Sequence, residues 1–217
     1  MTDTASQPPS APDDTRQRLI AAGFRLFGEA GFAATSTRRL AEAAQTNVAS
    51  ISYHFGSKAG LHEACARAVI ERVSAIAGVP QDHAGISAEA AAARLEQLVR
   101  GMTHFVATDG QATEIVEFIT RELNASPAIA DLLYDEFIGA KHRELCQLWS
   151  AATGLPEESE EVRLAVFAMI GQVVYFRIGQ RFVLRRMGWT RIGPEEAARL
   201  ADLLAANLHS ALERSRS

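Results

Sequence analysis

The residues best suited to chemistry lie between Arg38 and Lys58, and most of them donate hydrogen bonds. Serine and tyrosine hydroxyl groups can bind phosphate or a base edge, and a small side chain such as Ala49 can pack on a thymine methyl group. The guanidinium of Arg38 can bind guanine through two parallel hydrogen bonds. Lys58 stands at the expected start of a helix, where its ammonium and the backbone N–H groups favour the same phosphate. The predicted DNA-contacting residues are Arg38, Val48, Ala49, Ser50, Ser52, Tyr53 and Lys58.

Chemistry other than binding has little support in the sequence. We find no nucleophile elbow, phosphate-binding loop, paired carboxylates or complete set of metal ligands. His62 with Cys65, and His142 with Cys146, have spacings that suit two ligands on one helix, but each pair supplies only two donors. We therefore predict no catalytic residue, metal or cofactor.

Helices must position the predicted contact residues, because apolar residues recur at spacings of three and four almost throughout the chain. The first helices are expected over residues 15–30, 37–44 and 48–54, followed by a long helix that begins near Lys58. Gly31 is expected to end the first of them, and Asn47 to cap the third. Two short helices joined by a tight turn form a helix-turn-helix, whose second helix can enter the major groove.

The rest of the chain predicts a larger helical body. Its helices are expected over residues 87–107, 111–123, 127–152, 159–187 and 194–214. A loop that contains Gly78, Pro80 and Gly85 precedes them. We therefore expect an all-α fold, with a flexible tail at residues 1–12, a three-helix DNA-binding domain at residues 13–60 and a second helical domain at residues 61–217.

Charge and hydropathy narrow the choice of partners. The chain has 217 residues, of which 47% are hydrophobic, and its net charge is -4. Residues 13–67 carry seven Lys or Arg against five Asp or Glu, whereas residues 68–217 carry fifteen against twenty, which suits a protein that meets phosphate at one end. The longest apolar stretch, residues 165–176, is interrupted and too short to span a membrane, and the two cysteines suit reduced thiols. We expect a cytoplasmic protein without a membrane partner.

Several motifs of the N-terminal part resemble the TetR family of bacterial regulators. They are Gly31-Phe32, the run Thr35 to Arg38, the run Leu40 to Ala44 and the run Ile51 to Lys58. The resemblance covers about residues 15–62. It implies that Thr37 and His54 join the residues named above at DNA-facing or phosphate-facing positions.

The C-terminal part resembles one subgroup of that family, typified by the CerR (CecR) C-terminal domain. The motifs are Arg121-Glu122-Leu123, Ser126-Pro127-Ala128, Ile170-Gly171-Gln172, Phe176-Arg177 and Gly188-Trp189. Two residues depart from the family patterns: Gln45 replaces the usual glycine of the turn, and Ser52 replaces an asparagine common in the subgroup. A left-handed backbone at Gln45 would cost about 1 kcal/mol, and Ser52 would alter the base preference.

The resemblance implies a dimeric repressor that a small-molecule effector releases from double-stranded operator DNA. Its dimer contact would lie on the last two helices, because a helix that is apolar nearly all round needs cover on several sides. The candidate interface residues are Val162, Val166, Met169, Val173, Phe176, Leu200, Leu204 and Leu208. Polar or aromatic residues in the apolar middle helices are the candidates for the effector pocket: His104, Phe105, Glu117, Arg121 and Tyr134.

Two other hypotheses stay open on the sequence alone. One is a dimeric DNA-binding protein that responds to no ligand, such as a nucleoid or division factor. The other, less favoured, is an all-α enzyme that uses a cavity in the body. The sequence also allows an effector either to release DNA or to strengthen its binding.

Overall fold

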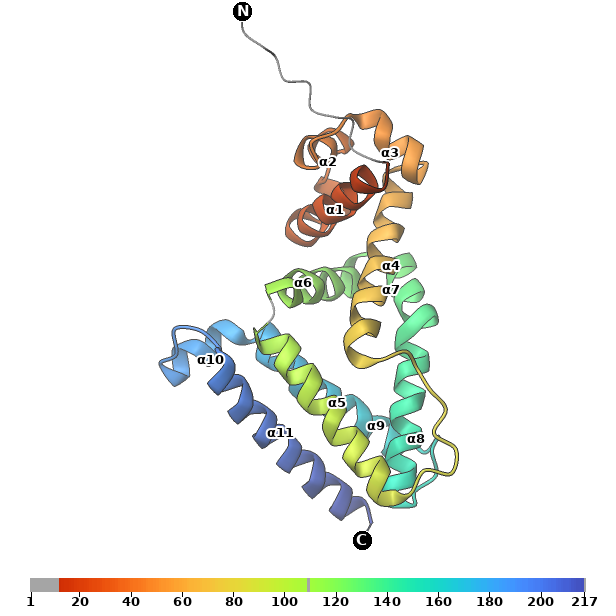
Figure 1. The fold of residues 1–217 in the computed structure, drawn as a ribbon, viewed down its shortest axis with the longest axis vertical. Helices are drawn as coiled ribbons and strands as arrows, with labels where there is room; N and C mark the ends of the chain where they lie inside the picture. Colours follow the sequence, from red (N-terminus) through yellow and green to blue (C-terminus); the bar gives the residue numbers. More distant parts are fainter. Residues whose placement is uncertain (1–11, 109, 217) are drawn as a thin grey trace, which may run out of the picture. The chain divides into compact units, whose positions relative to one another are not determined.

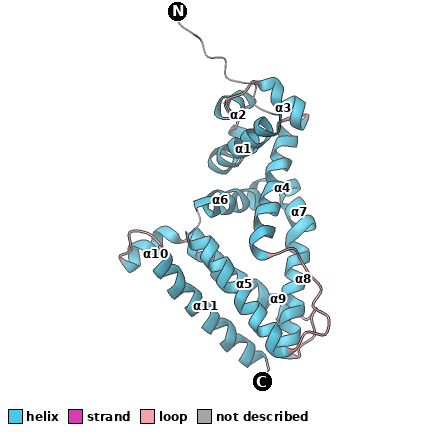
Figure 2. Cartoon of the chain, viewed as in Figure 1, coloured by secondary structure: helices cyan, strands magenta, loops and turns pink. Residues whose placement is uncertain are grey.

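The computed structural model describes residues 12–108 and 110–216, and the regular elements in these ranges are helices (Figure 1, Figure 2). The all-α fold that the sequence predicts is confirmed for this part of the chain. Two compact units meet between Ala68 and Val69, so the division lies inside a helix rather than at residue 60. The tail expected at residues 1–12 lies, apart from Pro12, outside the described residues.

The first unit is built from α1 (Pro12–Ala34), α2 (Thr37–Ala43), α3 (Val48–Phe55) and the N-terminal part of α4 (Lys58–Ala77). Its core consists of large apolar side chains that are fully buried: Leu19, Phe24, Phe27, Leu40, Ile51 and Leu61. Gly31 interrupts α1 with φ 81° and ψ 167°, a conformation that glycine adopts without steric penalty. The hydroxyl of Thr35 donates to the Gly31 carbonyl oxygen at 2.8 Å. The chain thus changes direction at the glycine that the sequence predicts.

The second unit continues from the end of α4 through the remaining helices. These are α5 (Ala88–Thr108), α6 (Gly110–Ala125), α7 (Pro127–Leu133), the π-helical turn η1 (Tyr134–Ile138), α8 (Gly139–Thr153), α9 (Glu160–Ile178), α10 (Gln180–Met187) and α11 (Pro194–Ser215). In Figure 1, α5 runs beside α11, and it also contacts α8 and α9. Apolar side chains of these four helices pack together in one core, in which Trp149 of α8 is 1% exposed.

The single helix expected over residues 159–187 is wrong, because the chain breaks at Gly179 into α9 and α10, which are bent by 71°. A Cβ atom at Gly179 would lie 3.0 Å from the carbonyl oxygen of Tyr175, so glycine permits the close approach at the bend. Within residues 12–108 and 110–216, no single helix has both the length and the apolar content of a membrane span. The bent pair α9 and α10 meets those two criteria only when both are taken together.

The helix expected over residues 127–152 is also interrupted, by the π-helical turn η1. The Gly139 N–H donates to the carbonyl oxygen of Tyr134, five residues earlier, instead of to the residue four earlier. A Cβ atom at Gly139 would lie 3.3 Å from the Tyr134 ring, so glycine leaves room for that ring. The extra residue in the turn rotates the side chains of α7 relative to those of α8.

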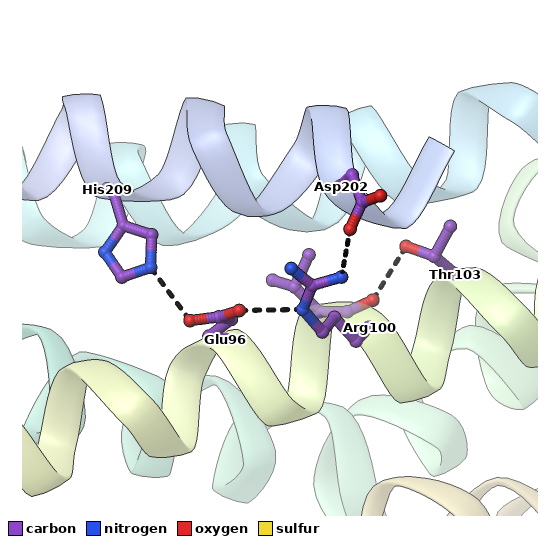
Figure 3. Close-up of polar contacts among 6 residues, drawn as sticks. Glu96, Arg100, Thr103, Asp202 and His209 are labelled. Carbon is purple, nitrogen blue, oxygen red and sulfur yellow. Dashed lines mark hydrogen bonds and ion pairs between the residues drawn. The ribbon is translucent and has the colours of Figure 1, made fainter. Parts of the chain in front are cut away.

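A network of charged side chains joins α5 to α11 (Figure 3). Glu96 lies 2.7 Å from Arg100 on α5 and 2.9 Å from His209 on α11. Arg100 also lies 2.7 Å from Asp202 on α11. Beside it, the Thr103 hydroxyl donates to the backbone carbonyl oxygen of Val99 on the same helix. Figure 3 shows the network joining the two helices at two positions, through Glu96 with His209 and through Arg100 with Asp202.

This network predicts a pH-dependent contribution to stability. Hydrogen bonds from Arg100 and His209 lower the pKa of Glu96 below its ordinary value of 4.5. A carboxyl whose pKa is lower in the folded state stabilises the fold above its unfolded pKa, and that stabilisation is lost as pH falls. We expect Glu96→Gln to lower the free energy of unfolding at pH 7 by less than about 1 kcal/mol, because the side chain is partly exposed. Urea unfolding should show the difference vanishing below pH 4.5; a difference that is independent of pH would contradict the assignment.

Candidate nucleic-acid interface and internal cavity

The ends of α2 and α3 are fixed by hydrogen bonds that their own sequence supplies. The hydroxyl of Ser36 accepts the Arg39 N–H at 3.2 Å, which caps the start of α2. The side chain of Asn47 accepts the Ser50 N–H at 2.9 Å, which confirms Asn47 as the N-cap of α3. Gln45, in the turn between the helices, has φ 51°. The strain that the sequence predicts for a residue other than glycine therefore applies there.

One side of α3 presents the residues that the sequence predicts for DNA contact. Tyr53 is 81% exposed and Val48 is 44% exposed, and Ala49 and Ser52 are exposed as well. Ile51, on the other side of the helix, is buried in the core of the first unit. The buried residue fixes the rotation of α3, so the small, hydroxyl and aromatic side chains of the exposed side stay accessible.

Arg38 is the most accessible cation of the predicted set. It lies in the first turn of α2, its side chain is 86% exposed, and its Nε is 2.9 Å from a carboxylate oxygen of Glu42. Such exposed pairs contribute little to stability, so the guanidinium can exchange Glu42 for another acceptor. Thr37 and His54 are half-buried, and the Ser50 hydroxyl is engaged with the turn that precedes α3. These three residues therefore also serve the fold.

Lys58 makes contacts inside the first unit. Its Nζ donates to the carbonyl oxygens of Phe32 and Thr35, each at 2.9 Å, and lies 4.1 Å from the centre of the Phe32 ring. An ammonium group has three N–H donors, and two of them are used in these bonds. Lys58 therefore fixes the start of α4 against the chain between Gly31 and α2, a role that the sequence did not reveal.

The second unit contains a cavity of about 250 Å³ that is lined by α4, α5, α6, η1, α8 and α9. Its wall includes three phenylalanines, Phe105, Phe137 and Phe167, with methionine and branched aliphatic side chains between them. The polar residues of this wall are Lys141 and His142. The cavity therefore suits a molecule that is mainly apolar.

Of the five residues predicted to form a pocket, Phe105 lines this cavity. His104, Glu117, Arg121 and Tyr134 are exposed and lie outside its wall. His104 precedes Phe105 by one position on α5, which turns it about 100° away. Tyr134 is the first residue of the π-helical turn, and Phe137 and Ile138 of the same turn line the cavity in its place. The cavity is thus lined mainly by apolar residues, whereas the sequence analysis predicted mainly polar residues for it.

A buried ionic cluster lies beside the cavity, and the sequence analysis did not predict it. Nζ of Lys141 is 2.6 Å from Oε2 of Glu144, and the other carboxylate oxygen is 3.0 Å from Nε2 of His83. Glu144 is 1% exposed, Lys141 9% and His83 13%. The only signal in the sequence is a lysine and a glutamate three residues apart in a largely apolar helix. Lys141 is also one of the residues that line the cavity, whereas Glu144 and His83 lie outside its wall.

His142 stands next to Lys141 in the wall and is uncharged at neutral pH. Its ring lies 4.0 Å from that of Phe167, measured between ring centres. Burial lowers the pKa of His142 below its ordinary value of 6.5.

The apolar stripe predicted for the dimer contact packs inside the second unit instead. Seven of its eight members are buried there: Val162, Val166, Met169, Val173, Leu200, Leu204 and Leu208. Phe176 is half-buried. These side chains form the core between α5, α8, α9 and α11, so they leave little surface for a partner copy.

The opposite side of the same two helices is exposed and apolar. We call it the outer face: Leu164, Ala168, Gly171, Tyr175 and Ile178 of α9, with Leu203 and Asn207 of α11. Leu164, Tyr175, Ile178 and Leu203 are each 52% to 59% exposed. A hydrogen bond of 3.0 Å between Gln172 and Asn207 joins the helices beside this face. A groove between Tyr175 and Leu203 crosses it.

Comparison with known proteins decides the family. The model described as bacterial regulatory proteins, tetR family, matches residues 19–65, and that of the HTH-type transcriptional dual regulator CecR, C-terminal domain, matches residues 91–213. The HTH-type transcriptional dual regulator CecR of Shigella flexneri is 31% identical over 198 residues, 85% of each chain. The chain belongs to the TetR family. The resemblance seen in residues 15–62 and in the C-terminal part is thereby confirmed.

Solved structures show the TetR fold as well. A TetR-like transcriptional regulator from Rhodococcus sp. RHA1 is 20% identical with a TM-score of 0.64, over 96% of this chain and 99% of that one. AibR, solved in complex with isovaleryl coenzyme A and operator DNA, is 17% identical with a TM-score of 0.65, over 89% and 97%. This TetR-family chain is thus a DNA-binding transcriptional regulator with an N-terminal helix-turn-helix, and not an enzyme.

Proposed function

We propose that two copies of this TetR-family chain bind operator DNA through α3 and the start of α2, and that a small molecule in the cavity of the second unit releases them. The observation that carries the DNA contact is the exposed side of α3, where Tyr53 is 81% exposed while Ile51 is buried. A helix held in this way can enter the major groove. The proposed contacts are Thr37, Arg38, Val48, Ala49, Ser50, Ser52, Tyr53, His54 and Lys58.

Dimerisation through the outer face supports this function. One helix-turn-helix reads only a half-site, so regulators of this kind pair two of them at a spacing of roughly 34 to 36 Å. The outer face exposes Leu164, Tyr175, Ile178 and Leu203 together on two long helices. Two copies related by a twofold axis would bury these faces against each other in a four-helix contact.

The position of α4 supports a response to a ligand. Val73, Ile76 and Ala77, in the last turns of α4, line the cavity. The same helix begins at Lys58, which is bonded into the first unit. A molecule that binds the cavity more tightly in one arrangement of α4 than in another shifts the equilibrium between the two arrangements. The shift in free energy equals the difference between its two binding free energies. This is the physical basis for release of the operator.

Selection of genomic fragments by the purified protein tests the proposed function. Fragments of its own genome are captured, sequenced and compared with the input. We expect enrichment of a small number of sites that share a sequence with twofold symmetry, because a symmetric dimer reads symmetric half-sites. Uniform recovery of all fragments would point instead to a DNA-binding protein of the nucleoid type.

We expect Arg38→Ala to weaken binding to the selected operator by about 1 to 3 kcal/mol and to relax the preference at one base pair. The reason is that Arg38 is exposed at the start of α2 and can bind a guanine edge in place of Glu42. Fluorescence anisotropy with operator variants measures both effects. Arg67→Ala is the matched control, since Arg67 also forms an exposed pair with a glutamate four residues away, but on α4. Equal losses in both variants would remove Arg38 from the base contacts.

A further inference from the structure

The wall of the cavity in the second unit offers almost no polar surface to a bound molecule. Apart from Lys141 and His142, the residues that line the cavity in the described part are apolar. They belong to helices, whose backbone N–H and carbonyl groups bond to one another along the helix. The polar ends of these two side chains therefore decide whether a bound molecule finds a hydrogen-bond partner.

The ammonium group of Lys141 is held by residues outside the cavity. Its Nζ donates to Oε2 of Glu144 at 2.6 Å. It also lies 3.9 Å from the position that a Cβ atom would take at Gly78, in the loop after α4. Neither Glu144 nor Gly78 lines the cavity. Lysine can cover an apolar surface with its methylene stem while its charged end reaches a polar neighbour, so Lys141 contributes carbon atoms to the wall.

The imidazole of His142 is engaged on both nitrogens by groups outside the wall. Nε2 lies 3.3 Å from the carbonyl oxygen of Arg163, and Nδ1 lies 3.6 Å from Sγ of Cys146. Burial raises the pKa of the Cys146 thiol to about 11, so the thiol keeps its proton at pH 7 and can donate it to Nδ1. A neutral imidazole has one N–H donor and one acceptor, and both are used here. His142 thus also presents carbon atoms to the cavity.

A wall of this kind selects against every group that water solvates strongly. A carbonyl or hydroxyl that enters loses its hydrogen bonds to water and finds no replacement, and a charged group loses more. A water molecule is excluded for the same reason, because it needs about two to four polar partners to stay in a cavity. A molecule without polar atoms loses no hydrogen bond and is stabilised by leaving water.

The volume and the lining set the size and shape of the rest of the molecule. A cavity of roughly 150 Å³ holds one benzene molecule. In proportion, the cavity of about 250 Å³ has room for roughly ten non-hydrogen atoms. Phe105, Phe137 and Phe167 contribute three aromatic rings to the wall, and rings pack favourably on other rings in offset or edge-on contacts.

We propose that the effector of this regulator is a small hydrocarbon of roughly ten non-hydrogen atoms, such as an alkylbenzene, without a charged or hydrogen-bonding group. As a statement about the effector, this inference rests on the proposed function. As a statement about binding, it concerns the second unit alone and is tested without DNA.

The test compares four probes with the same phenylalkyl body: butylbenzene, the ketone benzylacetone, hydrocinnamate and phenylpropylamine. Isothermal titration of the full-length protein without DNA gives the dissociation constants. We expect butylbenzene to bind roughly a hundredfold more tightly than benzylacetone, because the ketone oxygen is buried without a partner. The two charged probes should bind more weakly than the ketone. The proposal is overturned if butylbenzene does not bind, if benzylacetone binds within roughly tenfold of it, or if a charged probe binds more tightly.

Substitutions that fill the cavity locate the binding. Val116 on α6 and Val174 on α9 both line it, so Val116→Phe and Val174→Phe should each weaken butylbenzene binding about tenfold. The double variant should abolish it. Filling a cavity normally stabilises a fold, so the melting temperature should rise while binding is lost, which distinguishes a filled site from an unfolded protein.

Val79→Phe is the matched control for these variants. Val79 lies in the loop after α4, is 66% exposed and does not line the cavity. The same substitution there should leave the dissociation constant of butylbenzene unchanged. Unchanged butylbenzene binding in both single variants at the wall would overturn the assignment of the ligand to this cavity, whether or not the double variant folds.

Operator binding in the presence of butylbenzene separates this inference from the proposed function. If the hydrocarbon binds as expected but leaves the affinity for a selected operator unchanged, release by ligand is wrong and the ligand class of the cavity stands. If the protein selects symmetric operators but prefers the ketone or a charged probe, the ligand class is wrong and the DNA-binding function stands.

Discussion

Replacing Leu203 by glutamate is expected to convert the proposed dimer to a monomer and to lower operator affinity by roughly two to four orders of magnitude. Leu203 is 52% exposed and lines the groove on the outer face together with Tyr175. In a twofold contact each copy would bury one new carboxylate in an apolar surface without a partner, which is strongly unfavourable. The loss in DNA affinity follows because the second half-site no longer binds as part of the same molecule. Sedimentation and fluorescence anisotropy measure the two effects.

Leu123→Glu is the matched control for this prediction. Leu123 lies on α6, away from the outer face, and its exposure of 54% nearly equals that of Leu203. The same change in charge and size there should leave both the dimer and the operator affinity unchanged. A Leu203→Glu protein that still sediments as a dimer would exclude the outer face as the contact.

The sequence predicted best those features that local chemistry determines. Asn47 caps α3 and Gly31 breaks α1 in the structure because each acts on the backbone within a few residues of itself. The helical period placed Ile51 in the core and Tyr53 on the surface for the same reason. The exposed side of α3 could therefore be read from the chain without any knowledge of distant contacts.

Features that depend on which side of a helix packs against the core could not be predicted from local sequence. α9 is apolar nearly all round, so its period does not distinguish the side that faces the core, with Val166 and Val173, from the side that carries Leu164 and Tyr175. Burial alone separates them. The cavity was not predicted, because polar residues were expected to line it and its wall is apolar apart from Lys141 and His142. The buried cluster is recognisable only once Glu144 and His83 are seen beside Lys141.

Two differences between the predicted and the observed helices each have one local cause that the sequence indicates only weakly. In the π-helical turn the Gly139 N–H donates to the Tyr134 carbonyl oxygen, and Phe137 and Ile138, rather than Tyr134, line the cavity. The break at Gly179 ends α9 at Ile178, nine residues before the predicted end of that helix at residue 187. A single glycine within a helical pattern is usually tolerated. The period of the apolar residues therefore predicted a continuous helix at both places.

Gly60→Ala is expected to destabilise the first unit by about 3 kcal/mol. The Cβ atom of an alanine would collide with the carbonyl oxygen of Phe55, the last residue of α3, and a backbone atom cannot move aside as the end of a flexible side chain can. The start of α4 must then separate from the end of α3, which also disturbs the bonds of Lys58 to Phe32 and Thr35. Urea unfolding followed by circular dichroism measures the loss of stability, and operator affinity should fall with it.

Gly101→Ala provides the comparison, because Gly101 is exposed within α5 and a Cβ atom there would meet no other atom within 4 Å. In a helix, alanine is more favourable than glycine by roughly 0.5 to 1 kcal/mol, so this variant should become slightly more stable. The same substitution should thus lower the free energy of unfolding at Gly60 and raise it at Gly101. The difference between these two changes measures how closely α3 approaches α4. If Gly60→Ala is as well tolerated as Gly101→Ala, the close approach that orients α3 for DNA does not exist.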